Sequence, residues 1–298
     1  MQRRILAIAV LVAASSIVSQ AQKRASCTFN LFQLNRANPL NPSTQPNGVT
    51  DKGTVVGQAS FQSTQTEGFI RYPNGTVRYY SAPNAAATYF TDRNVKAISI
   101  GVYSTKGATN NIAKGFMLNG KDFTSIEHPK SVWGTHVQGI NKWNTVVGWY
   151  LDSNETSHSF ERLSSGRFVT LSYPGPGETG LAGINDNGMI VGNHSYARAG
   201  IGDGVVYYNG KWATLNYPEP SGTTTLFGVS DAGVIVGESS VTESGTAFLY
   251  ENGVFKRIVV PSSFATEVQG ISPDGLITGY VLLTGNENSQ HGFTARCK

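Results

Sequence analysis

Hydrophobic and polar positions follow a ten-residue pattern along the chain, and its clearest copy covers residues 183–192, GINDNGMIVG. Aliphatic runs flank the polar stretch 185–188, which ends in glycine, the residue most tolerant of positive φ. This arrangement is typical of two β-strands joined by a tight turn. Gly192 falls inside the second strand, where a glycine usually marks the close approach of another backbone segment.

The pattern occurs six times and therefore predicts a repeated unit. The copies start near residues 48, 89, 139, 183, 228 and 270, at intervals of 41 to 50 residues. That period is typical of β-propellers with four strands in each blade. Asn144 replaces the turn glycine in the third copy, and in the longer, degenerate second copy Asn94 is expected to replace it. We therefore predict a single all-β domain, a six-bladed propeller of four-stranded antiparallel blades.

Each unit carries two further strand signals. A short apolar run such as residues 68–70 (GFI) follows the hairpin, and a second tight turn such as Asn252-Gly253 comes next. The fourth strand ends at a proline, which is tolerated at strand ends and edges. Five units show this proline, at Pro83, Pro129, Pro174, Pro218 and Pro261. We name the strands in chain order: A and B form the hairpin of the ten-residue pattern, C is the short apolar run, and D ends at the proline.

The sixth unit stops after its third strand, so its fourth strand must come from elsewhere. Residues 27–39 alternate like a strand and end at a proline. They are expected to complete the last blade and close the ring. Alignment with the other blades places Cys27 and Cys297 where the fifth blade has the turn Asn252-Gly253. A disulfide between the two cysteines is therefore predicted to replace that turn.

The first 21 residues predict export. Arg3 and Arg4 precede an apolar run over residues 5–12, and residues 19–21 (SQA) form a small-residue cleavage site. The remaining 22–298 form the predicted domain. One disulfide agrees with a secreted, extracellular chain, and a periplasmic or cell-surface location fits the same signal.

Charge and motifs exclude several functions. The formal net charge of +4 falls to +2 without the signal segment, too little for a nucleic-acid surface. No later apolar run approaches the ~18 residues of a membrane span. Phosphate-binding loops, nucleophile motifs and metal-ligand spacings do not occur, so we expect no cofactor and no metal. We expect a monomer.

The pattern GIN-D-x-G-x-IVG, followed by H-x-F, NG-x-F and proline, resembles the HAF-type extracellular repeat of exported bacterial proteins. The resemblance covers roughly residues 39–293 and implies a propeller-like repeat. It implies no activity, ligand or site residues. The second unit departs most from the pattern, because it lacks both the leading glycine and the turn glycine.

The variable face of the ring is the candidate surface for function. The A–B and C–D turns are short and uniform, whereas the B–C loops and D–A crossovers vary and share the other face. Near its axial mouth, a threonine stands four residues before the repeat glycine in five units, and Ala85 breaks the ring in the second. These are Thr44, Thr135, Thr179, Thr224 and Thr266. They either cap loop backbone or form a polar ring around a ligand pocket.

Two other groups of residues are candidates at the same mouth. Glu178, Glu267 and His136 could perform acid/base chemistry if their side chains converge. Aromatic side chains could stack on sugar rings, although such residues more often cover the end of a core. These aromatic candidates are Trp133, Trp149, Tyr150 and Tyr280.

The interpretation that we favour is a secreted binding module that recognises an extracellular glycan or protein through this face. One alternative is a hydrolase or lyase acting on carbohydrate through an axial acid/base site. Another is a structural surface protein without a ligand.

Overall fold

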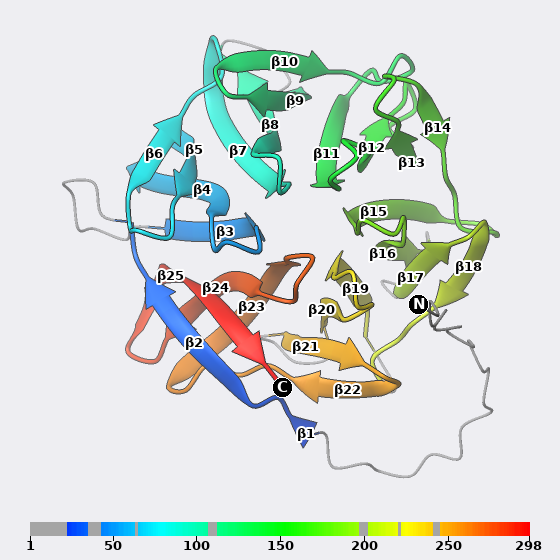
Figure 1. Ribbon diagram of the computed structural model, residues 1–298. Coiled ribbons are helices and arrows are strands. Elements are labelled where there is room, and N and C mark those ends of the chain that lie inside the picture. The colour runs from blue at the N-terminus through cyan, green and yellow to red at the C-terminus, as the bar shows by residue number, and fades with distance from the viewer. Residues whose placement is uncertain are drawn as a thin grey trace, which may run out of the picture.

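Six sheets stand around a central axis in the computed structural model, which describes residues 23–34, 43–62, 65–106, 112–196, 202–219, 222–240 and 245–298. The N-terminal and C-terminal strands lie side by side in the ring (Figure 1). Within the described residues every regular element is a strand, and none is a helix that could cross a bilayer. The predicted signal segment lies outside this part of the chain.

Each blade contains four antiparallel strands in the predicted order, with strand A nearest the axis (Figure 1). Strands A to D, blade by blade, are β3 (Ser43–Val49), β4 (Val55–Gln62), β5 (Gln65–Arg71), β6 (Val77–Tyr80); β7 (Ala85–Arg93), β8 (Ile98–Thr105), β9 (Ala113–Asn119), β10 (Asp122–Ile126); β11 (Gly134–Ile140), β12 (Val146–Leu151), β13 (Ser157–Arg162), β14 (Phe168–Thr170); β15 (Glu178–Ile184), β16 (Ile190–Ser195), β17 (Gly202–Tyr208), β18 (Lys211–Thr214); β19 (Thr224–Val229), β20 (Ile235–Ser239), β21 (Thr246–Glu251), β22 (Val254–Arg257); β23 (Ser263–Ile271), β24 (Ile277–Leu283), β25 (Asn286–Cys297), β2 (Cys27–Phe32). The short strand β1 (Lys23–Arg24) adds a parallel fifth strand to blade 5, which the sequence did not indicate.

A β-bulge interrupts strand A of every blade one residue before the repeat position. In blade 4 the register with β16 shifts between Leu181 and Gly183, so Ala182 is the extra residue. A bulge bends its strand and redirects the side chain of the extra residue. It also explains the glycine inside strand B, because a Cβ at Gly192 would lie 2.0 Å from the Gly180 carbonyl oxygen. The close approach predicted at Gly192 is confirmed.

The bulge also corrects the alignment of the second repeat. The shift in β7 falls between Phe90 and Asp92, so Asp92 occupies the position of the repeat glycine. The copy therefore starts at residue 92 with the standard length. The prediction that Asn94 replaces the turn glycine is wrong, because Ala97 has the positive φ of 65°. Asn144 does take that conformation in blade 3, with φ of 64°.

The repeat asparagine joins neighbouring blades as well as shaping its own turn. The Asn141 Oδ1 accepts hydrogen bonds from the Trp143 and Thr145 amides, while its Nδ2 donates to the Asn185 carbonyl of the next blade, 3.3 Å away. Asn185 repeats the arrangement and donates to the Ser230 carbonyl at 2.9 Å. These bonds form a belt on the face of the A–B turns.

Carboxylates of the same turns extend the belt. Asp186 Oδ1 accepts a hydrogen bond from the Lys142 amide at 2.7 Å, and Asp231 Oδ1 accepts one from the Asp186 amide at 2.9 Å. Asp51 links the last blade to the first, because its Oδ1 accepts from the Asp274 amide. The acidic position of the pattern thus stabilises the ring.

Strand C supplies the core. The phenylalanine of its signal is fully buried in five blades, at Phe69, Phe116, Phe160, Phe248 and Phe293. Phe116, for example, stacks on Phe123 and meets Phe90 edge to face. Full burial of one such side chain contributes about 1.5–3 kcal/mol.

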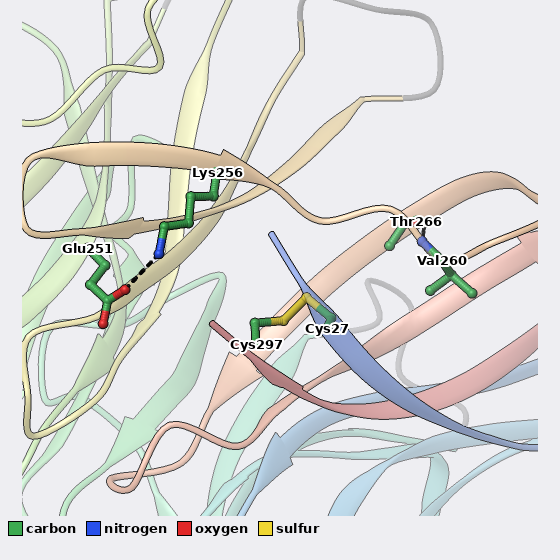
Figure 2. The surroundings of a disulfide bond; sticks show 6 residues. All are labelled: Cys27, Glu251, Lys256, Val260, Thr266 and Cys297. Carbon is green, nitrogen blue, oxygen red and sulfur yellow. Dashed lines mark hydrogen bonds and ion pairs between the residues drawn. A yellow bond between two sulfur atoms is a disulfide. The ribbon is translucent and has the colours of Figure 1, made fainter. Parts of the chain in front are cut away.

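The predicted ring closure is confirmed. β2 pairs antiparallel with β25 as the fourth strand of blade 6, and Cys27 lies directly opposite Cys297. The two cysteines form a disulfide across a sequence separation of 270 residues (Figure 2). It stands where the other blades have their C–D turn.

Replacement of both cysteines by serine should lower the thermal unfolding midpoint and leave the circular dichroism spectrum unchanged. The bond restricts the unfolded chain, and for a loop of this length the effect is at most about 5 kcal/mol. Dithiothreitol should lower the midpoint of the wild type and not that of the variant. An unchanged midpoint in the variant would contradict the closing role.

Asn141→Ala should destabilise the protein by about 1–3 kcal/mol, because it leaves the buried Asn185 carbonyl and two turn amides without their partner. Asn74→Ala is the matched control, since Asn74 accepts a bond from the Thr76 amide in an exposed turn. Urea unfolding of the two variants measures the difference. Equal stabilities would show that the belt contributes nothing.

Candidate axial binding site

A cavity of about 1090 Å³ lies on the axis between the innermost strands. The extra residue of each β-bulge lines it, so one geometric irregularity supplies a side chain from every blade. These six residues are Asn47, Thr91, Gln138, Ala182, Phe227 and Gln269. Amides form half of this set, and each offers both a donor and an acceptor.

A second tier of lining residues comes from cross-strand pairs between strands A and B. In blade 1, Gln58 donates a hydrogen bond to Gln45, and Gln45 donates to Gln290 of blade 6 at 2.7 Å. In blade 3, the ring of His136 stacks on that of Trp149, with centroids 3.8 Å apart and planes 8° from parallel. Burial lowers the pKa of His136 to about 4, so the imidazole is neutral at pH 7.

Asp92 brings a carboxylate to the cavity where five blades have glycine. Its Oδ2 accepts a hydrogen bond from the Ile140 amide at 2.9 Å, and its Oδ1 accepts one from the Arg93 amide at 2.7 Å. Burial raises the pKa of Asp92 to about 6, against which these two hydrogen bonds act.

Glu238 and Glu267 form a carboxyl pair between blades 5 and 6. Burial raises the pKa of Glu238 above its usual range, and the charge of Glu267 and a hydrogen bond between the two groups raise it further. The Glu238 Oε1 also accepts from the Val268 amide at 3.0 Å. The pair lies beside Tyr280 of the cavity wall, whose pKa is raised by burial and by both carboxyls. Glu238 therefore retains its proton at neutral pH.

The threonine ring lies behind the wall rather than on it. Six threonine hydroxyls each accept a hydrogen bond of 2.9–3.1 Å from a backbone amide that ends the preceding blade, as Thr266 does from Val260 (Figure 2). Their residues are buried, and the ring comprises Thr44, Thr88, Thr135, Thr179, Thr224 and Thr266. Thr88, not Ala85, is the equivalent in blade 2, so the ring is unbroken. This is the geometry of backbone capping.

The structure does not bring Glu178, Glu267 and His136 together. His136 lines the wall of blade 3, and burial is the cause of its pKa shift. Glu267 lies beside Glu238, and Glu178 is exposed at the first position of β15. The carboxyl that meets Glu267 is thus one that the sequence did not indicate.

The four aromatic candidates separate into two groups. Trp149 and Tyr280 line the cavity from blades 3 and 6. Tyr150 is 3% exposed and stacks on His128 within the core, with ring centroids 3.7 Å apart. Trp133 is half-buried and precedes β11, and within the described structure its indole nitrogen has no hydrogen-bond partner.

The sequence analysis did not identify the six bulge residues as lining residues, and it identified neither Asp92 nor Glu238. The bulge residues had a usable signal, because in five copies of the pattern the bulge residue immediately precedes the repeat glycine. Glu238 had none, since its partner comes from another blade. In the described parts of the chain, no three histidine, cysteine, aspartate or glutamate side chains are arranged to hold a metal ion.

Comparison with known proteins supports the fold alone. A TolB-type protein from Agrobacterium tumefaciens superposes with a TM-score of 0.57 at 10% identity, over 92% of this chain and 99% of that one. The Aleuria aurantia lectin, a six-bladed β-propeller, superposes in its fucoside-bound form with a TM-score of 0.53 at 11% identity. The superposition covers 90% of this chain and 96% of the lectin chain. The Hadza microbial sialidase Hz136 superposes with a TM-score of 0.53 at 10% identity, over 86% of this chain and 66% of the sialidase chain.

No protein-family model matches the chain, and no curated protein matches its sequence. The chain is a six-bladed β-propeller, and its resemblance to the HAF-type repeat stays a prediction.

Glu238→Gln should stabilise the protein at alkaline pH. Because the folded pKa of Glu238 is raised, the folded state retains a proton that the unfolded state loses above about pH 4.5, and stability falls as pH rises from there. At pH 8 the free energy of unfolding of the variant should exceed that of the wild type by about 1 kcal/mol or more. This corresponds to a thermal midpoint higher by roughly 2–4 °C. Scanning calorimetry between pH 4 and pH 9 measures this.

Glu178→Gln is the matched control, because it removes an exposed carboxyl and should change stability by less than about 0.5 kcal/mol. Parallel pH profiles of stability for Glu238→Gln and the wild type would contradict the raised pKa of Glu238.

Proposed function

We propose that the protein is a secreted binding module that holds a glycan in its axial cavity. The observation that carries the proposal is a cavity of about 1090 Å³ whose lining contains both amide side chains and aromatic rings. Amides match the donors and acceptors of sugar hydroxyls, and aromatic faces pack against sugar C–H groups. This volume is at the upper end of ligand pockets and accommodates several sugar units.

The shape of the wall supports an elongated ligand. Blade 4 contributes Gly180 and Ala182, which leave space, whereas blade 1 on the opposite side contributes Gln45, Asn47 and Gln58. A saccharide can thus lie over blade 4 while the amides of blade 1 bind its hydroxyls.

A second candidate function is a hydrolase or lyase acting on carbohydrate, and the Glu238–Glu267 pair favours it. Glu238 retains its proton at neutral pH beside a second carboxyl, as the general acid of such an enzyme would. Glycosidases, however, hold their carboxyls about 5–5.5 Å or 6.5–9.5 Å apart, whereas these two are hydrogen-bonded. Binding is therefore the stronger proposal, and a ligand-free structural role ranks third.

Trp149→Ala should weaken glycan binding about tenfold, because the ligand loses the aromatic face beside His136. Trp143→Ala is the matched control. Trp143 is 58% exposed and lies in an A–B turn, on the face away from the loops. A glycan array identifies the ligand, and calorimetric titration with that glycan compares the three proteins.

An equal loss of glycan affinity in Trp149→Ala and Trp143→Ala, or no loss in either variant, would contradict an axial site. Release of shorter sugars during the titration would establish the enzymatic candidate instead. Absence of any bound glycan or peptide would leave the structural role.

A further inference from the structure

The lining of the axial cavity is negatively charged. Its described residues include the carboxylate of Asp92 and neither lysine nor arginine, and His136 is neutral. Glu238 and Glu267 lie beside Tyr280 of this lining and are not themselves part of it. The chain as a whole carries a formal net charge of +4, opposite in sign to the one carboxylate of this lining.

No ion pair among the described residues includes Asp92. The neighbouring Arg93 does not neutralise it, because its Nη1 donates to the Ser99 hydroxyl at 2.6 Å and the guanidinium lies near Tyr72 and Tyr80. Each carboxylate oxygen of Asp92 accepts one backbone amide and retains a further lone pair. Desolvation of an unpaired carboxylate is costly, and a cation in the cavity would offset that cost.

Aromatic side chains line the same cavity as Asp92. Tyr89 comes from the same strand, β7, and Trp149 comes from β12 of blade 3. The faces of aromatic rings attract cations. A neutral sugar would leave Asp92 unpaired, and an acidic sugar would meet repulsion.

We infer that the axial cavity binds a cationic saccharide, one whose sugar units carry free amino groups. Asp92, the acidic residue of the lining, receives an ammonium group of the ligand. This inference rests on the proposed glycan-binding function and narrows it to one class of sugar.

Three β-1,4-linked tetrasaccharides test the inference, because they differ in a single substituent. They are the tetramers of glucosamine, N-acetylglucosamine and glucose, compared by calorimetric titration at pH 6.5. The wild type should bind the glucosamine tetramer at least tenfold more tightly than the other two. Asp92→Asn, which keeps the shape and one acceptor, should reduce that preference about tenfold.

Two further variants keep the test decisive. Asp122→Asn removes the same charge from the exposed outer strand of blade 2 and should preserve the preference. Asp92→Gly introduces the residue that the other five blades have at this position. It should lose the preference for the glucosamine tetramer, and it replaces Asp92→Asn in the test if that variant folds poorly. Thermal midpoints verify folding of each protein.

Equal affinity for the three tetramers would overturn the inference and leave glycan binding intact. A preference for the glucosamine tetramer that survives in both Asp92 variants would also overturn it. Binding of none of the tetramers, with a different glycan captured on the array, would reject the cationic class while the proposed function stands. Binding of no glycan at all would reject both.

Discussion

The extra residue in each innermost strand is the constraint on which the rest of this propeller depends. It pushes the strand A carbonyl against strand B so closely that only glycine fits there, as at Gly192. It also turns one side chain per blade towards the axis. The same irregularity therefore determines the repeat motif and supplies the candidate binding surface.

A belt of polar side chains fixes the blades around that axis. Asn141 and Asn185 hold their own turns and bind the next blade, and Asp186 and Asp231 add a second row. Apolar clusters such as the one around Val191 and Leu226 also join neighbouring blades, but apolar contacts are not directional. Hydrogen bonds from equivalent positions specify the angle between blades, and the disulfide closes the circle at the remaining seam.

The sequence predicted the architecture because period, turn glycines and terminal prolines are local signals. It also predicted the closing strand and the disulfide, since a missing fourth strand and a spare N-terminal strand must complement each other. It misplaced the second repeat because Asp92 and Ala97 replace the two glycines that mark the pattern. Only the bulge, a property of strand pairing, shows the correct alignment.

The candidate site was less predictable for a related reason. Threonines that recur by position proved to be hydrogen-bonded to backbone behind the wall, whereas the lining residues differ from blade to blade. Variation is expected where an asymmetric ligand contacts a symmetric ring. The Glu238–Glu267 pair depends on two blades that meet in space, and no spacing along one chain segment encodes it.

The central claim is that this protein acts through its axial cavity. Hydrogen exchange measured by mass spectrometry, with and without the glycan that binds most tightly, tests it most directly. The account predicts slower exchange in β3, β11 and β23 and around Trp149, all of which surround the cavity. Slower exchange confined to the outer strands or to the A–B turns, with the inner strands unchanged, would contradict it.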